Sequence, residues 1–381
     1  MTHKLSEIAC STKGKKPKSV SKEKTGGFEI PYVDIKAFEK GIVDNYTDGE
    51  NCTFCKPDDV LIVWDGARCG FVGRGVEGAI GSTLAKISSE KYTNDFLFYF
   101  LQSKYKVLNS NPRGVGIPHI EPNLLWNFEV PEVDKSTQRL IVSRIETLFA
   151  ELDKAVQHLR TAQQQLKTYR QAVLNHWLNN DDGKWEMVKL KDICLSISDG
   201  DHLPPKRTTQ GIPFITISDI KGNCIDYSDV SYMTEEYYES LSDSRKAQIG
   251  DILYTVTGSF GIPVMVEDDK KFCFQRHIGL VRPNPNLAAQ KWLYYMMQSP
   301  IIYSQANEKA TGTAQKTVTL TVLRDFNLPL PPLAEQQRIV KEIESRLSQA
   351  TASETYIENA LQQAEALRQS ILKKAFSGEL E

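Results

Sequence analysis

The sequence is written twice. Residues 111–178 align with residues 309–376 at a constant offset of 198 residues. The clearest matches are WNFEVP at 126–131 with RDFNLP at 324–329, QRLIVSRIE at 138–146 with QQRIVKEIE at 336–344, and YRQAVL at 169–174 with LRQSIL at 367–372. A chain that repeats itself is expected to fold as two similar modules and to present them to a partner with two equivalent sites. A DNA duplex is such a partner, because it offers equivalent faces once per turn.

The repeat continues upstream, with loops of different length in the two copies. YVDI at 32–35 corresponds to FITI at 214–217, and DVL at 59–61 corresponds to DIL at 251–253. These matches, together with the prolines and glycines at the junctions between them, divide the chain into four blocks. The first and third blocks mix β-like runs with Gly-rich turns, and the second and fourth are long helices. The blocks are 1–132, 133–180, 181–331 and 332–381.

Each of the two helical blocks, the second and the fourth, has a heptad pattern of apolar residues. No Pro or Gly interrupts 133–182, and apolar residues recur there in alternating steps of four and three, which is typical of a coiled-coil seam. The second helix keeps the pattern with some interruptions. Prolines precede each helix and Gly183 and Gly378 follow, as start and stop signals should. The predicted seam consists of Ile141, Ile145, Leu148, Leu152, Leu159 and Leu166 in the first helix and Ile339, Ile343, Ile357, Leu367 and Ile371 in the second.

A lone helix of this kind would expose an apolar stripe about 65 Å long, at ~1.5 Å per residue. The two helices are therefore expected to pair with each other in antiparallel fashion. The predicted fold class is α+β, with two mixed α/β modules separated by two long antiparallel coiled-coil helices. The alternative is that each helix dimerises separately, and the sequence leaves it open.

The composition excludes several classes of protein. Of 381 residues, 40% are hydrophobic and 25% are charged, with no run of 18 apolar residues, so we expect a soluble cytoplasmic protein without a membrane span. Seven irregularly spaced cysteines predict reduced thiols rather than a disulfide scaffold. The net charge of −2 does not indicate nucleic-acid binding, but a local basic strip suffices to bind phosphates.

No motif in the chain predicts catalysis, a metal or a cofactor. Gly73-x-Gly75-x-x-Gly78 fits a dinucleotide fingerprint, but no helical pattern follows it. Cys52 and Cys55 form half of a zinc pattern without a second pair. These patterns indicate a recognition or scaffolding protein rather than an enzyme.

Polar loops in matching places of the two copies are the remaining candidates for a site. Lys and Arg there would neutralise DNA phosphates, and Arg, Asn, Gln and Ser would read base edges in the major groove. The first copy has a lysine strip at 13–24, and the second has the loop 199–209 in its place. The predicted DNA-binding residues are Lys15, Lys16, Lys18, Lys22, Arg68, Arg74 and Arg113 in the first copy and His202, Lys206, Arg207, Thr208, Ser259, Thr311, Thr313 and Lys316 in the second.

Several motifs, in duplicate and in order, carry a family resemblance. They are NFEVP at 127–131 with QRLIV at 138–142, DFNLPLPP at 325–332 with EQQRIV at 335–340, DGDH at 199–202, GDIL at 250–253 and AFSGEL at 375–380. With these motifs the whole chain resembles the specificity subunit of type I restriction-modification systems.

This resemblance implies a non-catalytic reader of double-stranded DNA. Each mixed block would be a target-recognition domain for one half of an asymmetric bipartite site, and the helices would set the gap between the halves. Two modification subunits would dock on the helices and carry S-adenosylmethionine. Two restriction subunits would use ATP and Mg²⁺ for translocation and cleavage, and this chain would hold no cofactor itself.

Two other interpretations stay open. The paired helices would also suit an adaptor that bridges partners without touching DNA, and salt-dependent, sequence-specific DNA binding would exclude that interpretation. The chain would equally suit a related system in which it serves a fused nuclease-methyltransferase. Only the partner distinguishes that system from a restriction complex with separate subunits.

Overall fold

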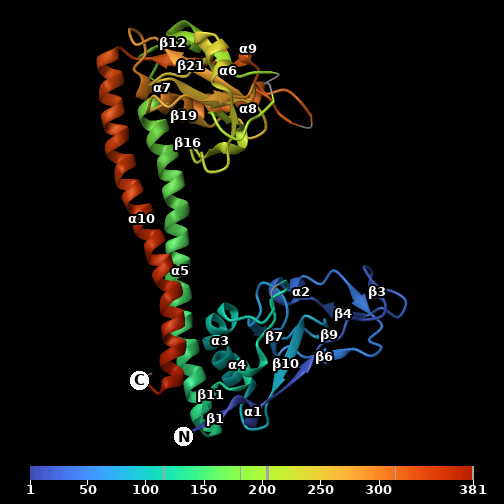
Figure 1. Cartoon of the computed structure of the whole chain (residues 1–381). Helices are drawn as coiled ribbons and strands as arrows, with labels where there is room; N and C mark the ends of the chain where they lie inside the picture. The colour runs from blue at the N-terminus through green and yellow to red at the C-terminus, as the bar shows by residue number, and fades with distance from the viewer. Residues whose placement is uncertain (115, 181, 203–205, 314, 380–381) are drawn as a thin grey trace. The chain divides into compact units, whose positions relative to one another are not determined.

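The computed structural model describes residues 1–379 apart from residues 115, 181, 203–205 and 314. Residues 203–205 of the loop 199–209 and Leu380 of the AFSGEL motif therefore lie outside the described residues. The chain forms two compact units (Figure 1). Unit 1 comprises Met1–Arg160 and Glu358–Glu381, and unit 2 comprises Thr161–Ile357.

Each unit is built on a four-stranded antiparallel sheet, and the strand order is equivalent in the two units. The order is β2-β10-β7-β8 in unit 1 and β13-β21-β18-β19 in unit 2. The strands are β2 Cys10–Lys13, β7 Val60–Val63, β8 Val72–Arg74 and β10 Leu84–Ser88, and their counterparts are β13 Cys194–Asp199, β18 Ile252–Thr255, β19 Pro263–Met265 and β21 Ile278–Pro283. The repeat in the sequence is thus a repeat in topology, and the predicted α+β class is confirmed.

The central strand of each sheet is apolar and buried on both faces. In β7, Val60 and Ile62 belong to the core shared with the helices, whereas Leu61 and Val63 belong to a second core on the other face. In β18, Ile252 and Tyr254 face the helical core and Leu253 faces the other. Alternation of side chains along a strand explains this division, and burial on both faces explains why the sequence there is continuously apolar.

A second, outer sheet differs between the units. Both contain one parallel pair, β4 with β9 in unit 1 and β14 with β20 in unit 2. Unit 1 extends it to the order β3-β5-β4-β9-β6, and unit 2 to β17-β14-β20 with a separate β15-β16 hairpin. The bounds are β3 Val20–Ser21, β4 Ile30–Val33, β5 Tyr46–Thr47, β6 Thr53–Cys55, β9 Gly78–Ile80, β14 Ile212–Ile215, β15 Ile220–Lys221, β16 Cys224–Ile225, β17 Ser231–Met233 and β20 Cys273–Phe274.

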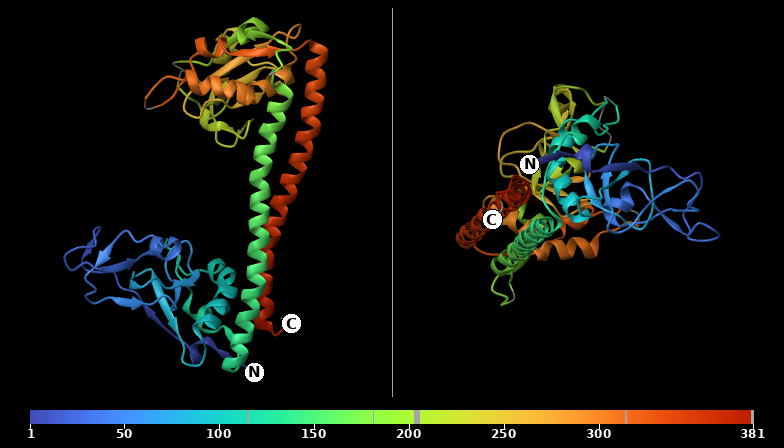
Figure 2. Two further views of the ribbon diagram at one scale, coloured as in Figure 1. Left: turned by 180° about the vertical axis from the view of Figure 1, so that it is seen from behind. Right: turned by 90° about the horizontal axis from the view of Figure 1, so that it is seen from below.

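The long helices are α5 Lys135–Leu178 and α10 Leu333–Ser377. The strand leading into each one pairs with the first strand of the preceding block: β11 Glu129–Pro131 with β1 Thr2–Lys4, and β22 Asn327–Leu330 with β12 Glu186–Lys189. The shorter helices are α1 Leu5–Ile8, α2 Ile35–Lys40, α3 Asn94–Ser110, α4 Pro122–Trp126, α6 Glu235–Ser240, α7 Gln290–Gln298, α8 Pro300–Lys309 and α9 Leu320–Arg324. In unit 1, α3 and α4 lie between the central sheet and the long helices (Figures 1 and 2).

A buried glutamine fastens the start of each long helix to its unit. The side-chain oxygen of Gln138 accepts from the Thr93 amide at 2.9 Å, and its amide donates to the carbonyls of Lys91 and Val133. Gln336 makes the equivalent contacts, accepting from the Ala289 amide at 2.7 Å and donating to Leu287 and Pro331. Both glutamines are fully buried, and these bonds explain why the same polar residue occurs in both copies.

Each unit contains the start of one long helix and the end of the other. In unit 1, Ile145 and Phe149 of α5 pack with Ile371 and Leu372 of α10. The ring of Phe376 also meets α3, with centroids 5.2 Å from Phe96 and 5.4 Å from Phe100. In unit 2, the corresponding helix end supplies Leu178, which is fully buried in the same cluster as Ile339 and Ile343.

Within each unit the two helix segments run antiparallel. In unit 1, Ile145 packs near Leu372 and, two turns later, Asp153 pairs with Arg368. In unit 2, Arg170 donates to both carboxylate oxygens of Glu354, at 3.0 and 2.8 Å, and to the Thr351 hydroxyl at 2.7 Å. Arg170 and Arg368 are equivalent in the repeat, so both units place an arginine against the facing helix.

The structure differs from the predicted seam at one position of the second long helix, where a charged residue takes the place of an apolar one. Leu367 is 51% exposed, so its prediction as a seam residue is wrong. Its neighbour Arg368 lies on the inner face instead, with its guanidinium 4.3 Å above the ring of Phe149. Of the other predicted residues, Ile145, Ile339, Ile343, Ile357 and Ile371 are buried, and Ile141, Leu148, Leu152, Leu159 and Leu166 are half-buried. The apolar pattern favoured Leu367 because a charged side chain fits a seam only when a partner on the facing helix compensates it.

Among the described residues, no helix is both long and apolar enough to cross a membrane.

Candidate nucleic-acid interface

Four loops gather at one end of each central sheet, where β2, β7 and their counterparts finish. We call this end the loop edge. Strand register places them together, because Lys13 lies beside Ala85 and Val63 beside Leu84, and Asp199 lies beside Gly279 and Thr255 beside Ile278. The described residues of these loops are 14–19, 64–71, 81–83, 111–114 and 116–119 in unit 1, and 200–202, 206–209, 256–262, 275–277, 311–313 and 315–317 in unit 2.

Equivalent backbone hydrogen bonds join these loops in the two units. In unit 1 the Gly66 amide donates to the Pro118 carbonyl at 2.7 Å, and in unit 2 the Gly258 amide donates to the Lys316 carbonyl at 3.0 Å. The strand-ending and pre-helix loops are therefore held together in the same way. Since these two loops are fixed to each other, the side chains on them start from a well-positioned backbone.

A glycine allows the closest backbone approach at the loop edge. A Cβ added to Gly14 would lie 2.1 Å from the Gly81 carbonyl oxygen, and one added to Gly200 would lie 2.0 Å from that of Phe274. Neither separation is physically possible for a carbon and an oxygen that are not bonded. Both variable loops, the lysine strip and the loop 200–209, thus leave the sheet at a position where only glycine fits.

The lysines predicted in unit 1 are exposed. Lys15, Lys16, Lys18 and Lys22 follow β2 or flank β3, and the ammonium of Lys18 lies 3.5 Å from the carboxylate of the exposed Glu50. Arg113 is exposed in the pre-helix loop, where its backbone exchanges hydrogen bonds of 2.8 and 2.9 Å with His119.

The two other arginines predicted in unit 1 have partners within the protein. Arg68 lies at the loop edge, but it pairs with Glu39 at 2.7 Å and its guanidinium lies 4.1 Å above Phe71. Arg74 lies outside the loop edge, because antiparallel pairing puts it beside Val60 at the opposite end of the sheet. There it pairs with Asp95 and covers the ring of Phe98 at 4.2 Å. The fold therefore gives Arg74 a structural role.

All the residues predicted in unit 2 lie on loops of the loop edge. His202 contacts Asp199 at 2.9 Å, Thr208 donates its amide to the Tyr232 carbonyl at 2.8 Å, and the guanidinium of Arg207 lies 5.3 Å from the ring of Phe214. The others are exposed, and they are Lys206, Ser259, Thr311, Thr313 and Lys316.

The structure adds a charged cluster in unit 1 that the sequence did not predict. Asp65 lies between Lys13, at 2.8 Å, and the Nδ1 atom of His119, at 2.6 Å. It thereby joins the end of β2, the strand-ending loop and the pre-helix loop. In unit 2 the position of Asp65 is taken by Thr257, which bridges Thr317, so the same frame carries different polar groups. From the sequence alone, only the offset between the two copies would have shown that Asp65 and Thr257 are equivalent positions.

A second unpredicted group lies in unit 2, between β20 and β21. Gln275 contacts Nδ1 of His277 at 2.9 Å, and Nε of Arg276 donates to Nε2 of His277 at 3.4 Å. Burial lowers the pKa of His277, and the positive charge of Arg276 lowers it further. The sequence signal is three consecutive polar residues with hydrogen-bonding side chains between two buried strands.

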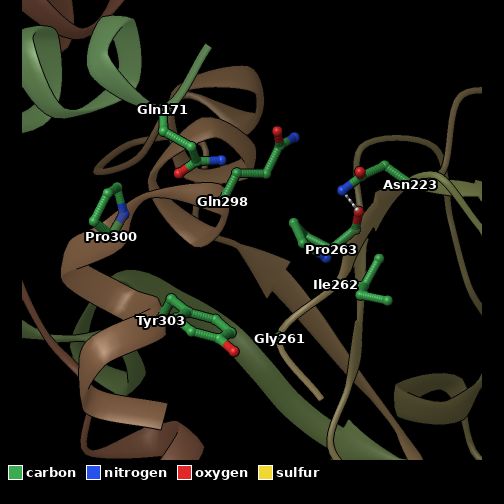
Figure 3. Close-up of a pocket in the computed structure, with 8 residues that line it drawn as sticks. All are labelled: Gln171, Asn223, Gly261, Ile262, Pro263, Gln298, Pro300 and Tyr303. Carbon is green, nitrogen blue, oxygen red and sulfur yellow. Dashed lines mark hydrogen bonds between the residues drawn. The ribbon is translucent and has the colours of Figure 1, made fainter. Parts of the chain in front are cut away.

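The pocket in Figure 3 lies beside these loops in unit 2 and has different chemistry. It encloses about 390 Å³, and its lining includes Gln171, Asn223, Gln298 and Tyr303 but no charged side chain (Figure 3). The Asn223 amide is already bonded to the Pro263 carbonyl at 2.9 Å. Such a pocket offers no group that would neutralise a phosphate. Among the described residues, no cluster of three or more His, Cys, Asp or Glu side chains is arranged to hold a metal ion.

Comparison with known proteins gives one consistent family. The type I restriction modification DNA specificity domain matches residues 1–159 and again residues 182–363. The specificity subunit of the type I restriction enzyme EcoBI from Escherichia coli is 25% identical over 92% of this chain and 80% of its own length. That of MjaVIII from Methanocaldococcus jannaschii is 24% identical over 87% of this chain and 82% of its own.

Solved structures share the fold. A chain from a structure concerning complex assembly and conformational transition of a type I restriction-modification system superposes with a TM-score of 0.72 at 21% identity, covering 100% of this chain and 98% of that one. The HsdS subunit from Thermoanaerobacter tengcongensis superposes with a TM-score of 0.54, also at 21% identity, covering 100% and 97%.

Proposed function

This chain belongs to the type I restriction-modification DNA specificity family, and from that premise we propose that it reads a two-part DNA site, one half through each unit. The observation that carries the proposal is the duplicated loop edge. Two frames with the same backbone bonds present different polar side chains, as a reader of two different half-sites requires. The four blocks 1–132, 133–180, 181–331 and 332–381 would then be recognition domain, helix, recognition domain and helix.

Polar residues on the loop edge, and Lys22 beside it, would hold the phosphates. Lys15, Lys16, Lys18, Lys22 and Arg113 would do so in unit 1, and His202, Lys206, Arg207 and Lys316 in unit 2, with Ser259, Thr311 and Thr313 as hydroxyl donors. The exposure of these residues supports the assignment. Thr208 would contribute less, because it is half-buried and its hydroxyl already donates to the Gln210 carbonyl at 2.8 Å. Arg68 would support its loop rather than contact DNA, and Arg74 would have a structural role at the opposite end of the sheet, since both already pair with carboxylates.

The long helices would dock the partner subunits and fix the gap. Two modification subunits would bring S-adenosylmethionine, and two restriction subunits would bring ATP and Mg²⁺. The chain itself would act in the cytoplasm as a recognition subunit without catalysis. Insertion of one heptad into each helix is expected to change the gap between half-sites and to leave the half-sites themselves unchanged.

Genomic methylation tests this proposal. Cells that carry the chain with its methyltransferase partner are compared with cells that lack only the chain. Loss of one bipartite motif from the second strain is the expected result. A methylation pattern that does not depend on the chain would contradict the proposal and would favour an adaptor that does not touch DNA.

A further inference from the structure

The loop 275–277 of unit 2 is held by its backbone at every residue. The Gln275 amide donates to the Ile215 carbonyl at 3.0 Å, the Arg276 amide to Asp201 at 3.1 Å, and the His277 carbonyl accepts from Val256 at 2.9 Å. Gly200 closes the loop from the other side, where any Cβ would meet the carbonyl of Phe274. Three polar side chains are thus mounted on a backbone that has little freedom to move, as precise recognition requires.

The side chains form a directed chain of hydrogen bonds. A guanidinium only donates, so the Nε2 atom of His277 must accept from Arg276. A neutral imidazole has one acceptor nitrogen, so Nδ1 carries the proton and donates. The structure places the amide nitrogen of Gln275 at 2.9 Å from Nδ1. Two donors cannot bond to each other, so we assign the side-chain amide the opposite orientation, in which its oxygen accepts from Nδ1 and its nitrogen and oxygen exchange places. The lowered pKa of His277 agrees with a neutral ring.

This chain of bonds leaves only donors pointing outward. In this assigned orientation the Gln275 amide nitrogen is turned away from His277. The two terminal nitrogens of Arg276 have no ion-pair partner among the described residues. Arg276 is exposed, while Gln275 and His277 are half-buried. A fork of donors matches the N7 and O6 acceptors of guanine in the major groove, which is the commonest base contact of arginine.

Nearby acidic groups are already engaged. Asp199 is paired with His202 at 2.9 Å and with Arg245 at 3.4 Å, and Asp201 accepts from the Tyr237 hydroxyl. The matching loop of unit 1 is Gly81-Ser82-Thr83, whose side chains are too short to form such a fork.

Building on the proposed function, we propose that residues 275–277 are a base-reading loop, and that Arg276 contacts N7 and O6 of one guanine in the half-site read by unit 2. Unit 1 has no equivalent reader in this loop. His277 and Gln275 orient the guanidinium and are positioning residues.

The test measures base preference in the assembled complex of this chain with its methyltransferase subunits. Competition binding at one fixed salt concentration compares the natural duplex with duplexes in which each guanine of both half-sites is replaced in turn. For the natural protein we expect one guanine whose replacement lowers affinity roughly 5- to 150-fold. In Arg276→Ala this preference should vanish at that position and persist at all others.

Two further variants and one modified base sharpen the result. Arg276→Lys keeps the charge and removes the fork, so it should abolish the guanine preference with little change in salt dependence. 7-Deazaguanine at the same position removes N7, so it should weaken binding by the natural protein and not by Arg276→Ala. Lys271→Ala removes an exposed cation at the far end of β20 and serves as the matched control, with preferences unchanged.

Each other outcome overturns the proposal. Equal weakening of Arg276→Ala on every duplex would make the residue a phosphate contact, and unchanged affinity on every duplex would remove it from the interface. Assembly of the complex is checked for each variant, and if Arg276→Ala does not assemble, Arg276→Lys decides. If the natural complex itself showed no sequence-specific binding, the proposed function would fail as well, and that result is distinct from the first two.

Discussion

Units 1 and 2 share a frame and differ in what the frame presents. Both have the same four-stranded sheet, the same parallel pair and the same buried glutamine at the start of a long helix. They differ in the outer sheet and at the loop edge, where unit 1 has a lysine strip and a Lys13–Asp65–His119 cluster, and unit 2 has the loop 275–277. The difference teaches that the duplicated residues are those that position the loops, and in the function proposed above the unduplicated ones would be those that contact DNA.

The largest expected effect is a loss of stability when the packing between the two long helices is disrupted, and each unit should be destabilised independently of the other. Ile145 and Ile343 are equivalent and fully buried. Replacement of either with Asp removes a core side chain and buries a charge, and should destabilise the affected unit by more than about 4 kcal/mol. Hydrogen exchange should show reduced protection in unit 1 for Ile145→Asp and in unit 2 for Ile343→Asp. Variants with Val at these positions are the controls, and an equal response of both units to either variant would contradict two separate cores.

The next largest effect should differ between the units, because equivalent aspartates have different surroundings in them. Asp251 of unit 2 is buried and held by Arg282 at 2.8 Å, whereas the equivalent Asp59 is partly exposed and lies 3.4 Å from Lys86. We expect Asp251→Ala to cost about 3 kcal/mol, because it leaves the half-buried Arg282 without its carboxylate partner and the Gln248 amide without its acceptor. Asp59→Ala should cost about 1.5–3 kcal/mol, mainly for its bond to the Lys56 amide. Urea unfolding of each variant measures the difference, and equal losses of stability would refute it.

The glutamines at the helix starts should have equal effects. Gln138→Ala and Gln336→Ala each remove three hydrogen bonds made by a fully buried side chain, which predicts a destabilisation of about 1–3 kcal/mol in either unit. The exposed neighbour Gln337 provides a control, since Gln337→Ala should change stability little. If only one of the two buried glutamines mattered, the shared frame would not be energetically equivalent.

The smallest effect concerns the cations of the loop edge. Alanine at Lys15, Lys16 and Lys18 in unit 1, or at Lys206 and Arg207 in unit 2, should weaken DNA binding. The salt slope should fall by up to about 0.9 for each phosphate that the variant no longer neutralises. Sequence preference should survive, because phosphate contacts carry no base information. Titration at several salt concentrations measures the slope, and an unchanged slope would remove that strip from the interface.

Much of this frame could be predicted from the sequence. A repeat with a constant offset is visible without a structure, and the heptad pattern predicted both long helices to within a few residues of their ends. Proline and glycine at the junctions marked those ends, and Gly378, at φ 78°, directly follows α10. These features were visible because they depend on local spacing and on burial, which the pattern of apolar residues reports directly.

The loop edge was predicted less completely, because its contacts are not local. Arg74 is the type of residue that contacts DNA, but strand pairing places it beside Val60. Gln275 and His277 carry no motif, and their hydrogen bond depends on how β20 leads into β21. The seam prediction favoured Leu367 over Arg368, since no pattern of apolar residues shows that Asp153 on the facing helix compensates the charge.

The central claim is that the two units have interchangeable frames and that each unit reads its own half-site independently. An exchange of recognition domains tests this claim most directly. Residues 1–132 are replaced by residues 181–331, and the methylated motif is read from genomic DNA in cells that carry the methyltransferase partner. Interchangeable frames predict a motif with two identical half-sites, both copied from the half read by unit 2. Retention of the original asymmetric motif would contradict the claim.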